Sequence, residues 1–302
     1  MGRAEGSSEL GVSHSMGHGE LVRQYYDESS RLFLRFGPGR GEGAIHRPVW
    51  AQGINNRRDA VKYANEQILS CLRDTEAQNV LDLGCGVGGT IAYLATRHSS
   101  YRPIRYTGIT VSPYQAATAR ERFQRLDKKG DASCTVLAGD FMNSDSNRVM
   151  HNSFDLMYAI EAFAHADSAN AFFRAASVYA AQGCTLVLID DYLKRRPATG
   201  SDEYRRLLRY KWGWRVPSIM TPDELVRTAA DHGFVLDYSV DWTAEVSRHG
   251  VRDYLLRFCA PLLELGSDHS EWCRSMVGGD ALKRLLVEDV IGYGLFRFSL
   301  KR

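Results

Sequence analysis

NVLDLGCGVGGT, residues 79–90, is the stretch of the sequence that decides the fold. Residues 80–83 predict a short buried strand that runs into a glycine-rich turn and then into a helix beginning near Gly88. The glycines let the backbone turn sharply and approach a ligand closely, where a Cβ atom would collide. The first turn of the helix presents unpaired N–H groups, which suit an anionic or polar ligand. The stretch therefore predicts a ligand-binding loop; the alternative is a glycine turn that holds no ligand.

The glycine spacing also satisfies the dinucleotide-binding fingerprint. That interpretation requires an acidic residue about 20 positions later to bind a ribose, and no Asp or Glu occurs between Asp82 and Glu121. Asp82 lies two residues before the first glycine, and the run DLGCG resembles the first motif of class I S-adenosylmethionine (SAM) methyltransferases. The resemblance implies SAM as cofactor and S-adenosylhomocysteine as product. It assigns cofactor contacts to Asp82, Gly84, Cys85, Gly86 and Gly88.

The composition and charge of the chain exclude several classes of protein. The chain has 302 residues and a formal net charge of +2, without a basic run interleaved with aromatics, so no nucleic-acid partner is expected. No run of about 18 apolar residues occurs, so no stable membrane insertion is expected. Six scattered cysteines without a Cys-x-x-Cys pair favour a reduced, cytoplasmic protein without a metal site. His14 and His18 have a metal-ligand spacing, but the segment is glycine-rich and solvated histidines are expected there.

The rest of the chain predicts one domain behind a flexible arm. Residues 1–19 are rich in Gly, Ser and His and are expected to be mobile, or ordered by a partner subunit in a homo-oligomer. Residues 20–302 are expected to form a single methyltransferase domain. Its parts are cap helices (20–76), a cofactor-binding half (77–191), and a substrate lid with the last strands (192–302).

Alternating patterns predict an α/β fold with a doubly wound sheet. Strands are expected at residues 80–83, 104–109, 133–137, 154–160, 185–189 and 291–298, with a further strand entered at Phe234. Helices are expected at residues 20–36, 55–72, 114–126, 168–180, 254–265 and 281–287, with another opened by Thr221 and Pro222. With the resemblance, this becomes a Rossmann-like class I methyltransferase fold: a seven-stranded, mostly parallel sheet, helices on both faces, and a helical lid insertion. The resemblance also implies that the last strand is antiparallel.

Polar residues cluster at the carboxyl ends of the predicted strands. They are Thr110, Asp140, Glu161, Asp190 and Asp191. Ligands of doubly wound sheets bind at that edge, so these residues are expected to share one pocket.

Two further segments resemble cofactor-binding motifs. GITVSPYQ, residues 108–115, resembles the lipid cyclopropane-forming branch, in which a Thr and a Gln contact the cofactor; this assigns Thr110 and Gln115. The Asp140-Phe141 pair resembles the adenine-binding motif, a carboxylate and an aromatic ring, although Asp140 could instead cap a helix.

YAIEAFAHA, residues 158–166, resembles the signature of sterol and terpenoid C-methyltransferases. The cyclopropane-forming relatives have Gly in place of Glu161 and Glu in place of Ala164, which weakens that alternative. Tyr25 and Tyr26 resemble the N-terminal Tyr-Tyr segment that closes over the cofactor in sterol C-methyltransferases. The resemblance assigns cofactor contacts to Tyr25 and to Ala159.

Methylation of an alkene leaves a carbocation, which a base must deprotonate before it rearranges. Glu161 is the predicted base, and its charge also favours the cation. His165 is predicted as a second base or as the residue that orients Glu161, and Tyr26 is the third predicted catalytic residue. The structural alternatives are a carboxylate at a helix N-terminus for Glu161 and a buried hydrogen-bonding residue for His165.

Aromatic residues outside these motifs are predicted to bind the acceptor. The run YKWGWR, residues 210–215, resembles a lid whose aromatic rings suit a hydrophobic or cationic guest and whose bases could hold a diphosphate. The alternative is a packed helical insertion with solvated charges. The residues assigned to the acceptor are His46, Trp50, Phe163, Tyr192, Tyr210, Trp212 and Trp214.

The resemblance therefore predicts a SAM-dependent C-methyltransferase of terpenoid secondary metabolism. Its acceptor would be a small hydrophobic isoprenoid or a prenylated metabolite, methylated through a carbocation. Geranyl diphosphate or a sterol is the alternative acceptor. A small-molecule O- or N-methyltransferase and a non-catalytic SAM-binding subunit are the alternative functions.

Overall fold

The computed structural model describes residues 17–36, 43, 46–98, 102–126, 132–144, 149–246 and 270–301. The predicted helix at residues 254–265, His14, and all of the arm before residue 17 lie outside these ranges.

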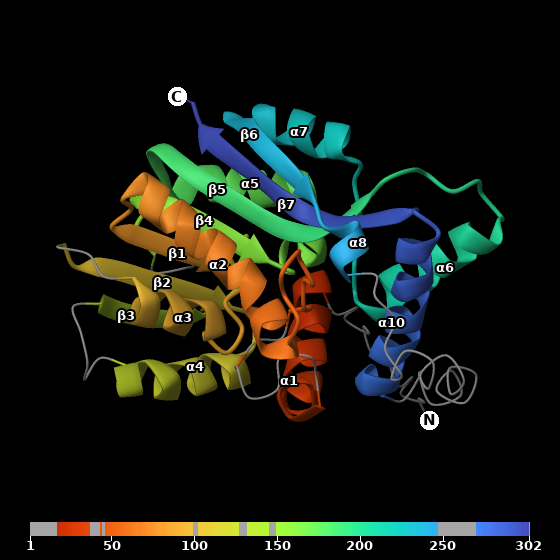
Figure 1. Ribbon diagram of the computed structural model, residues 1–302, viewed down its shortest axis with the longest axis horizontal. Helices are drawn as coiled ribbons and strands as arrows, with labels where there is room; N and C mark the ends of the chain where they lie inside the picture. Colours follow the sequence, from red (N-terminus) through yellow and green to blue (C-terminus); the bar gives the residue numbers. More distant parts are fainter. Residues whose placement is uncertain are drawn as a thin grey trace, which may run out of the picture.

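Seven strands form one sheet in the order β3-β2-β1-β4-β5-β7-β6. Their bounds are β1 Asn79–Leu83, β2 Ile104–Thr110, β3 Ala132–Ala138, β4 Phe154–Ile160, β5 Ala180–Leu193, β6 Phe234–Asp241 and β7 Ile291–Leu300. β1 to β5 pair in parallel, whereas β7 runs antiparallel between β5 and β6. The predicted fold class is confirmed, including the antiparallel last strand that the resemblance implied (Figure 1).

Helices cover both faces of the sheet and its carboxyl edge (Figure 1). Their bounds are α1 His18–Phe36, α2 Arg57–Thr75, α3 Gly89–Arg97, α4 Pro113–Leu126, η1 Phe163–His165, α5 Ala169–Tyr179, α6 Asp202–Gly213, α7 Pro222–Ala230, α8 Thr243–Val246 and α10 Glu271–Val287. Residues of α2, α3 and α4 belong to one core cluster, and residues of α5 and α7 belong to a second. α1, α6 and α10 gather at the edge where the parallel strands end (Figure 1).

Helix starts follow local chemistry, as the sequence predicts. Ser168 caps α5 by accepting a hydrogen bond from the backbone N–H of Ala171. Thr221 and Glu224 form a capping box at α7, with Pro222 in its first turn. Such caps satisfy N–H groups that the helix itself leaves unpaired, which is why these starts could be predicted from the sequence.

Two elements, α10 and β5, differ from the prediction by more than three residues. α10 begins at Glu271, ten residues before the predicted start, because Gly278 and Gly279 lie inside the helix rather than before it. A Cβ atom at Gly278 would lie 2.7 Å from the Trp214 ring, so this glycine lets α10 pack closely against the end of α6. β5 extends from Ala180 to Leu193, well beyond the predicted residues 185–189.

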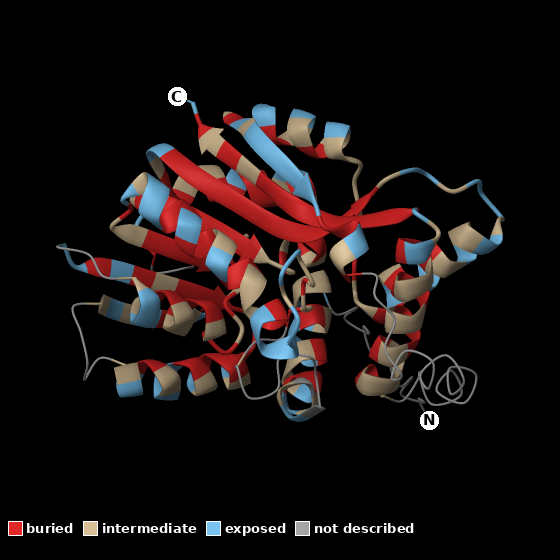
Figure 2. Cartoon of the chain, viewed as in Figure 1, coloured by how far each residue is buried: buried red, intermediate tan, exposed pale blue. Residues whose placement is uncertain are grey.

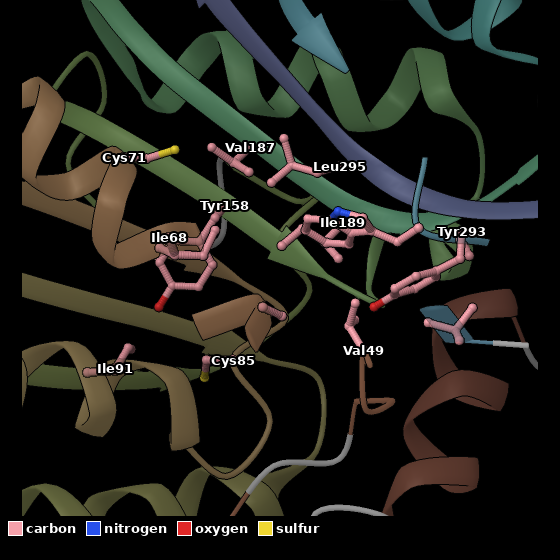
Figure 3. Packing of buried hydrophobic residues seen from close by; sticks show 14 of the residues in the cluster. Val49, Ile68, Cys71, Cys85, Ile91, Tyr158, Val187, Ile189, Tyr293 and Leu295 are labelled. Atoms are coloured by element: carbon pink, nitrogen blue, oxygen red, sulfur yellow. The ribbon is translucent and has the colours of Figure 1, made fainter. Parts of the chain in front are cut away.

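The central strands are buried on both faces. β4, β5 and β7 are largely buried, whereas β6 at the sheet edge is mostly exposed (Figure 2). Figure 3 shows part of one core cluster, which includes Ile68 of α2, Tyr158 of β4 and Ile189 of β5. This core fixes the strand ends that carry the polar residues.

Candidate active site

The glycine loop has the backbone geometry that the sequence predicts. Gly84 and Gly86 have φ values of 100° and 51°, in the left-handed region that favours glycine. A Cβ atom at Gly84 would lie 2.4 Å from the Cβ atom of Ala162. Gly88 also has positive φ, but a Cβ atom there would lie 2.6 Å from the ring of Phe123. The absence of a side chain at Gly88 therefore allows the start of α3 to pack closely against α4.

A pocket of about 730 Å³, counting its open mouth, lies over this loop. Its lining residues are Gly19, Val22, Tyr26, His46, Gly84, Gly86, Thr110, Val111, Gln115, Asp140, Phe141, Met142, Ile160, Glu161, Ala162 and His165. An adjoining pocket shares Gly84 and Gly86 and adds Asp82 and Cys85. We call these two the cofactor pocket.

Thr110 and Gln115 connect the cofactor pocket to α1. The Thr110 hydroxyl donates to Gln115 Oε1 at 2.6 Å, and Gln115 Nε2 donates to the Ser30 hydroxyl at 2.8 Å. The Ser112 hydroxyl donates to Asp27, also on α1. Both predicted contacts line the pocket, and they also hold α1 over it.

Burial raises the pKa of two carboxyl groups of the cofactor pocket, Asp82 and Asp140. It raises the pKa of Asp82 to about 8, against the opposing effect of the neighbouring Tyr158 hydroxyl. It also raises the pKa of Asp140, whose Oδ1 accepts the Met142 N–H at 2.9 Å. A cationic group or a hydrogen-bond donor on a ligand would stabilise the ionised form of each.

A second pocket meets the cofactor pocket at Glu161. Its lining residues are Tyr25, Tyr26, Arg47, Glu161, Ala164, His165, Asp190, Asp191, Tyr210, Trp214 and Val216. We call it the acceptor pocket. Tyr26, Glu161 and His165 line both pockets. These are the three residues that the sequence analysis assigns to catalysis, so the structure brings them together at one junction.

Glu161 is held in an unusual conformation at this junction. Its φ of 51° is left-handed, which costs a non-glycine residue about 1–2 kcal/mol. Glycine would occupy this conformation without that cost. Burial raises the pKa of Glu161, but Arg47 and His46 lower it more, and the net pKa lies below its ordinary value. Glu161 is therefore ionised at neutral pH.

Arg47, which the sequence analysis missed, is the principal partner of Glu161. Its Nε lies 3.1 Å from Glu161 Oε1, and its Nη2 lies 2.8 Å from Asp191 Oδ1. Tyr210 of α6 donates to the other oxygen of Asp191 at 2.8 Å. No motif surrounds Arg47 in the sequence, and its role depends on contacts with β5, β7 and α6.

Tyr293 of β7 is a second partner of Glu161 that the sequence did not predict. Its hydroxyl donates to Glu161 Oε1 at 3.0 Å, and its ring lies 4.2 Å from the Arg47 guanidinium. The run Gly292-Tyr293-Gly294 is the signal that could have indicated it, since glycines inside a strand often mark a close approach.

His165, the second predicted base, lies on η1. Its Nε2 is 2.9 Å from the Tyr26 hydroxyl. The backbone carbonyl oxygen of His165 lies 3.1 Å from His18 Nε2. Burial lowers the pKa of His165 to about 4, although the Arg215 backbone raises it. His165 is therefore neutral at pH 7 and is a weak base.

Asp190 fastens the segment that carries Glu161 and His165. Its Oδ2 accepts the Ala164 N–H at 2.9 Å, and its Oδ1 accepts the Asp191 N–H at 2.8 Å. Burial and the neighbouring Asp191 raise the pKa of Asp190 to about 7 despite these two donors.

Several predicted site residues lie away from these pockets. Ala159 is buried within β4, Phe163 packs edge-on against Phe172, and Tyr192 packs against Phe296. The Trp50 N–H donates to the Glu245 carbonyl, and Trp212 is 37% exposed under Arg274. Tyr25, assigned to the cofactor, lines the acceptor pocket instead. Of the predicted acceptor residues, Tyr210 and Trp214 line the acceptor pocket and His46 lines the cofactor pocket.

Metal ligands do not gather anywhere in the described part of the chain. There, no group of three or more His, Cys, Asp or Glu side chains could hold a metal ion. No helix in the same ranges has the length and apolarity needed to cross a membrane.

Comparison with solved structures establishes the fold. The chain superimposes on a geranyl diphosphate methyltransferase with a TM-score of 0.70 and 17% identity, covering 94% of this chain and 100% of the other. It superimposes on a cyclopropane synthase of Mycobacterium tuberculosis with a TM-score of 0.72 and 18% identity, covering 94% and 98%. The fold is therefore that of class I methyltransferases.

The sequence comparisons match part of the chain to methyltransferases. Residues 81–186 match the family model described as methyltransferase domain. An O-methyltransferase of Pyrenophora dematioidea is 28% identical over 66% of this chain and 71% of its own. Cycloartenol-C-24-methyltransferase of Arabidopsis thaliana is 30% identical over 50% of this chain, which spans only 40% of that protein.

Together these findings confirm the predicted class, a SAM-dependent methyltransferase. The predicted cofactor agrees with the structural neighbours, among them a geranyl diphosphate C-methyltransferase of Streptomyces coelicolor A3(2) in complex with S-adenosylhomocysteine.

Proposed function

We propose that the protein transfers a methyl group from SAM to an alkene carbon of a hydrophobic isoprenoid or prenylated metabolite. The observation that carries the proposal is the junction of the two pockets at Tyr26, Glu161 and His165. A methyl donor on one side and an alkene on the other would meet at these three side chains. Holding the two reactants in line supplies much of the rate enhancement that a weak nucleophile requires.

The cofactor pocket fits SAM. Gly84 and Gly86 allow a ligand to approach the backbone, and the buried Asp82 offers a carboxyl group for an ammonium. Asp140 and Phe141 would hold the adenine, and Thr110 and Gln115 the ribose or the carboxylate. When bound, SAM supplies an electrophilic methyl group on a positively charged sulfur.

The residues at the junction suit a cation that develops on the acceptor. The ionised Glu161 stabilises positive charge, and the rings of Tyr25, Tyr26, Tyr210 and Trp214 wall the acceptor pocket. Aromatic faces stabilise a desolvated cation by about 2 kcal/mol or more. The C–H proton beside the cationic carbon then passes to Glu161 or His165, and its electron pair forms the new double bond.

The basicity of these groups favours carbon over oxygen as the methylated atom. The pKa of His165 is lowered to about 4, and the pKa of Glu161 lies below its ordinary value. Such weak bases suffice to deprotonate a carbocation but are poorly matched to a hydroxyl group at neutral pH. O-methylation is nevertheless the second candidate, because O-methyltransferases are the relatives that match over the larger share of their own length.

The charges of the acceptor pocket favour a neutral acceptor over geranyl diphosphate. Arg47 is the only arginine or lysine among the described residues that line this pocket. It is already paired with two carboxylates, Glu161 and Asp191. A diphosphate would therefore meet excess negative charge. A neutral prenylated acceptor therefore fits the acceptor pocket better than geranyl diphosphate does. We place the reaction in secondary metabolism and in the cytoplasm.

The test is product analysis with methyl-¹³C SAM. The protein is incubated separately with a neutral prenylated indole, geranyl diphosphate and a phenol. We expect the label on a new carbon–carbon bond in the first product, detected by NMR. Label found only on oxygen would replace the proposal with O-methylation, and a labelled geranyl diphosphate product would refute the neutral acceptor.

A further inference from the structure

The hydrogen bonds to Glu161 converge on a single oxygen. Oε1 accepts the backbone N–H of Arg47 at 2.9 Å, Arg47 Nε at 3.1 Å and the Tyr293 hydroxyl at 3.0 Å. Among the described residues, Oε2 accepts no hydrogen bond. A carboxylate offers about four lone-pair sites, so this uneven distribution leaves one oxygen fixed and the other available at the junction of the two pockets.

Arg47 is itself held from three elements. Its Nη2 pairs with Asp191 of β5 at 2.8 Å, and Tyr210 of α6 donates to the same carboxylate. Its guanidinium lies over the Tyr293 ring of β7 at 4.2 Å and 5.7 Å from the Trp214 ring. Arg47 is thus fixed before any ligand binds, with its side chain only 12% exposed.

We propose that Arg47 is a positioning residue for methyl transfer: it clamps one oxygen of Glu161, so that the other oxygen faces the reacting carbon. The proposal rests on the role of Glu161 in the proposed function. The left-handed backbone at residue 161 would not persist without contacts that stabilise it, and the clamp supplies them. Tyr293 completes the clamp by donating to the same oxygen.

The clamp also keeps Glu161 ionised. Burial alone would raise the pKa of this carboxyl group, and Arg47 is the strongest opposing influence. Removing the guanidinium would leave a buried carboxylate without its cation, which then takes up a proton. The ionisable groups that face Glu161 are His46, Arg47, Tyr25, Tyr26, His165, Asp190, Asp191, Tyr210 and Tyr293. Of these, Arg47 is the one permanent cation.

The first experiment compares Arg47→Met with Arg47→Lys in steady-state kinetics. We expect kcat to fall by about 100-fold in Arg47→Met, the cost of a misplaced reacting group, with KM for SAM little changed. Arg47→Lys should recover part of the loss, because it restores the charge but not the two-point geometry. Arg206→Met is the matched control, since it breaks a similarly half-buried ion pair with Glu288 outside both pockets. Unchanged kcat in Arg47→Met would overturn the proposal.

The double variant separates positioning from a general structural effect. If Arg47 acts through Glu161, adding Arg47→Met to Glu161→Gln should cause no further loss of kcat. Losses that multiply would show that Arg47 acts independently and would overturn the proposal. Tyr293→Phe provides a milder test in case Arg47→Met fails to fold. It removes one donor to the ionised carboxylate and should lower kcat by about tenfold.

A measurement without turnover distinguishes failure of this inference from failure of the proposed function. In protein labelled with ¹³C at the glutamate carboxyl carbons, the Glu161 resonance is the one missing from Glu161→Gln. We expect it to stay ionised from pH 8 to 5 in the wild type and to titrate in that range in Arg47→Met. Identical titration in both proteins would refute the clamp, whether or not an alkene is the acceptor.

Discussion

The cofactor pocket and the acceptor pocket are assembled in different ways. Except for residues of α1, Gly43 and His46, the cofactor pocket is lined by the carboxyl ends of parallel strands and by the segments that follow β1, β2, β3 and β4, within residues 82–165. The acceptor pocket draws on α1, the loop at Arg47, the end of β5 and α6, and Tyr293 of β7 backs Glu161. The first is encoded by short motifs, whereas the second exists only when distant segments pack. The two should therefore respond differently to substitution.

The largest effect is expected at the cofactor pocket, for Gly86→Val. A branched side chain at a φ of 51° is strained and would stand where the ligand approaches the backbone. We expect S-adenosylhomocysteine to bind more than about 100-fold more weakly by titration calorimetry.

Gly183→Val is the control for this substitution. Gly183 has a φ of 75°, and nothing lies within 4 Å of the position that a Cβ atom would occupy, so the variant carries similar strain outside the pocket. Its affinity should equal that of the wild type. Equal affinity in Gly86→Val would show that the glycine loop does not hold the cofactor.

A narrower effect, confined to the chemical step, is expected for Glu161→Gln. This change removes the charge and basicity but keeps the size, so kcat should fall by about 10²–10⁴-fold. Affinity for S-adenosylhomocysteine should stay within about twofold, and rearranged or water-trapped products should increase because the cation persists. Kinetics, calorimetry and mass spectrometry of the products measure the three outcomes.

Glu203→Gln, which loses a surface ion pair with Arg195, should behave as the wild type. If Glu161→Gln lost cofactor affinity and turnover together, the separation of the two pockets would not hold. Near-normal turnover would remove Glu161 from the mechanism.

The last effect is on stability alone and concerns Asp82. The pKa of this buried carboxyl is raised to about 8, whereas in the unfolded chain it is about 4. Between these values the folded chain binds a proton that the unfolded chain does not, so stability falls as pH rises toward 8. Asp82→Asn removes this dependence. We expect the variant to gain stability relative to the wild type between pH 5 and pH 8.5, by on the order of a few kcal/mol.

Urea unfolding of the ligand-free protein at the two pH values measures this difference. A constant difference between wild type and Asp82→Asn would mean that Asp82 is ionised throughout. The buried neutral acid would then be absent from the cofactor pocket.

The sequence by itself determined the sheet and the cofactor side of the site. Residues 80–83 and the glycines after them specify a strand and a turn through local geometry. Thr110, Gln115, Asp140 and Glu161 follow strands whose carboxyl ends must meet at one edge of a parallel sheet. Motif and topology together therefore place these residues around one pocket.

Only the tertiary structure revealed the partners of Glu161. Arg47 and Tyr293 lie 114 and 132 positions from Glu161, and neither belongs to a motif with a fixed spacing. Their roles come from the packing of a loop and the antiparallel β7 against the end of β5. The sequence also predicted acceptor contacts that the structure places outside both pockets, at Trp50, Phe163, Tyr192 and Trp212. Aromatic residues occur in a core or on a surface as well as in a pocket, so the residue type alone did not show where these side chains lie. Motifs encode local backbone geometry, whereas side-chain neighbours across the fold depend on how distant segments pack.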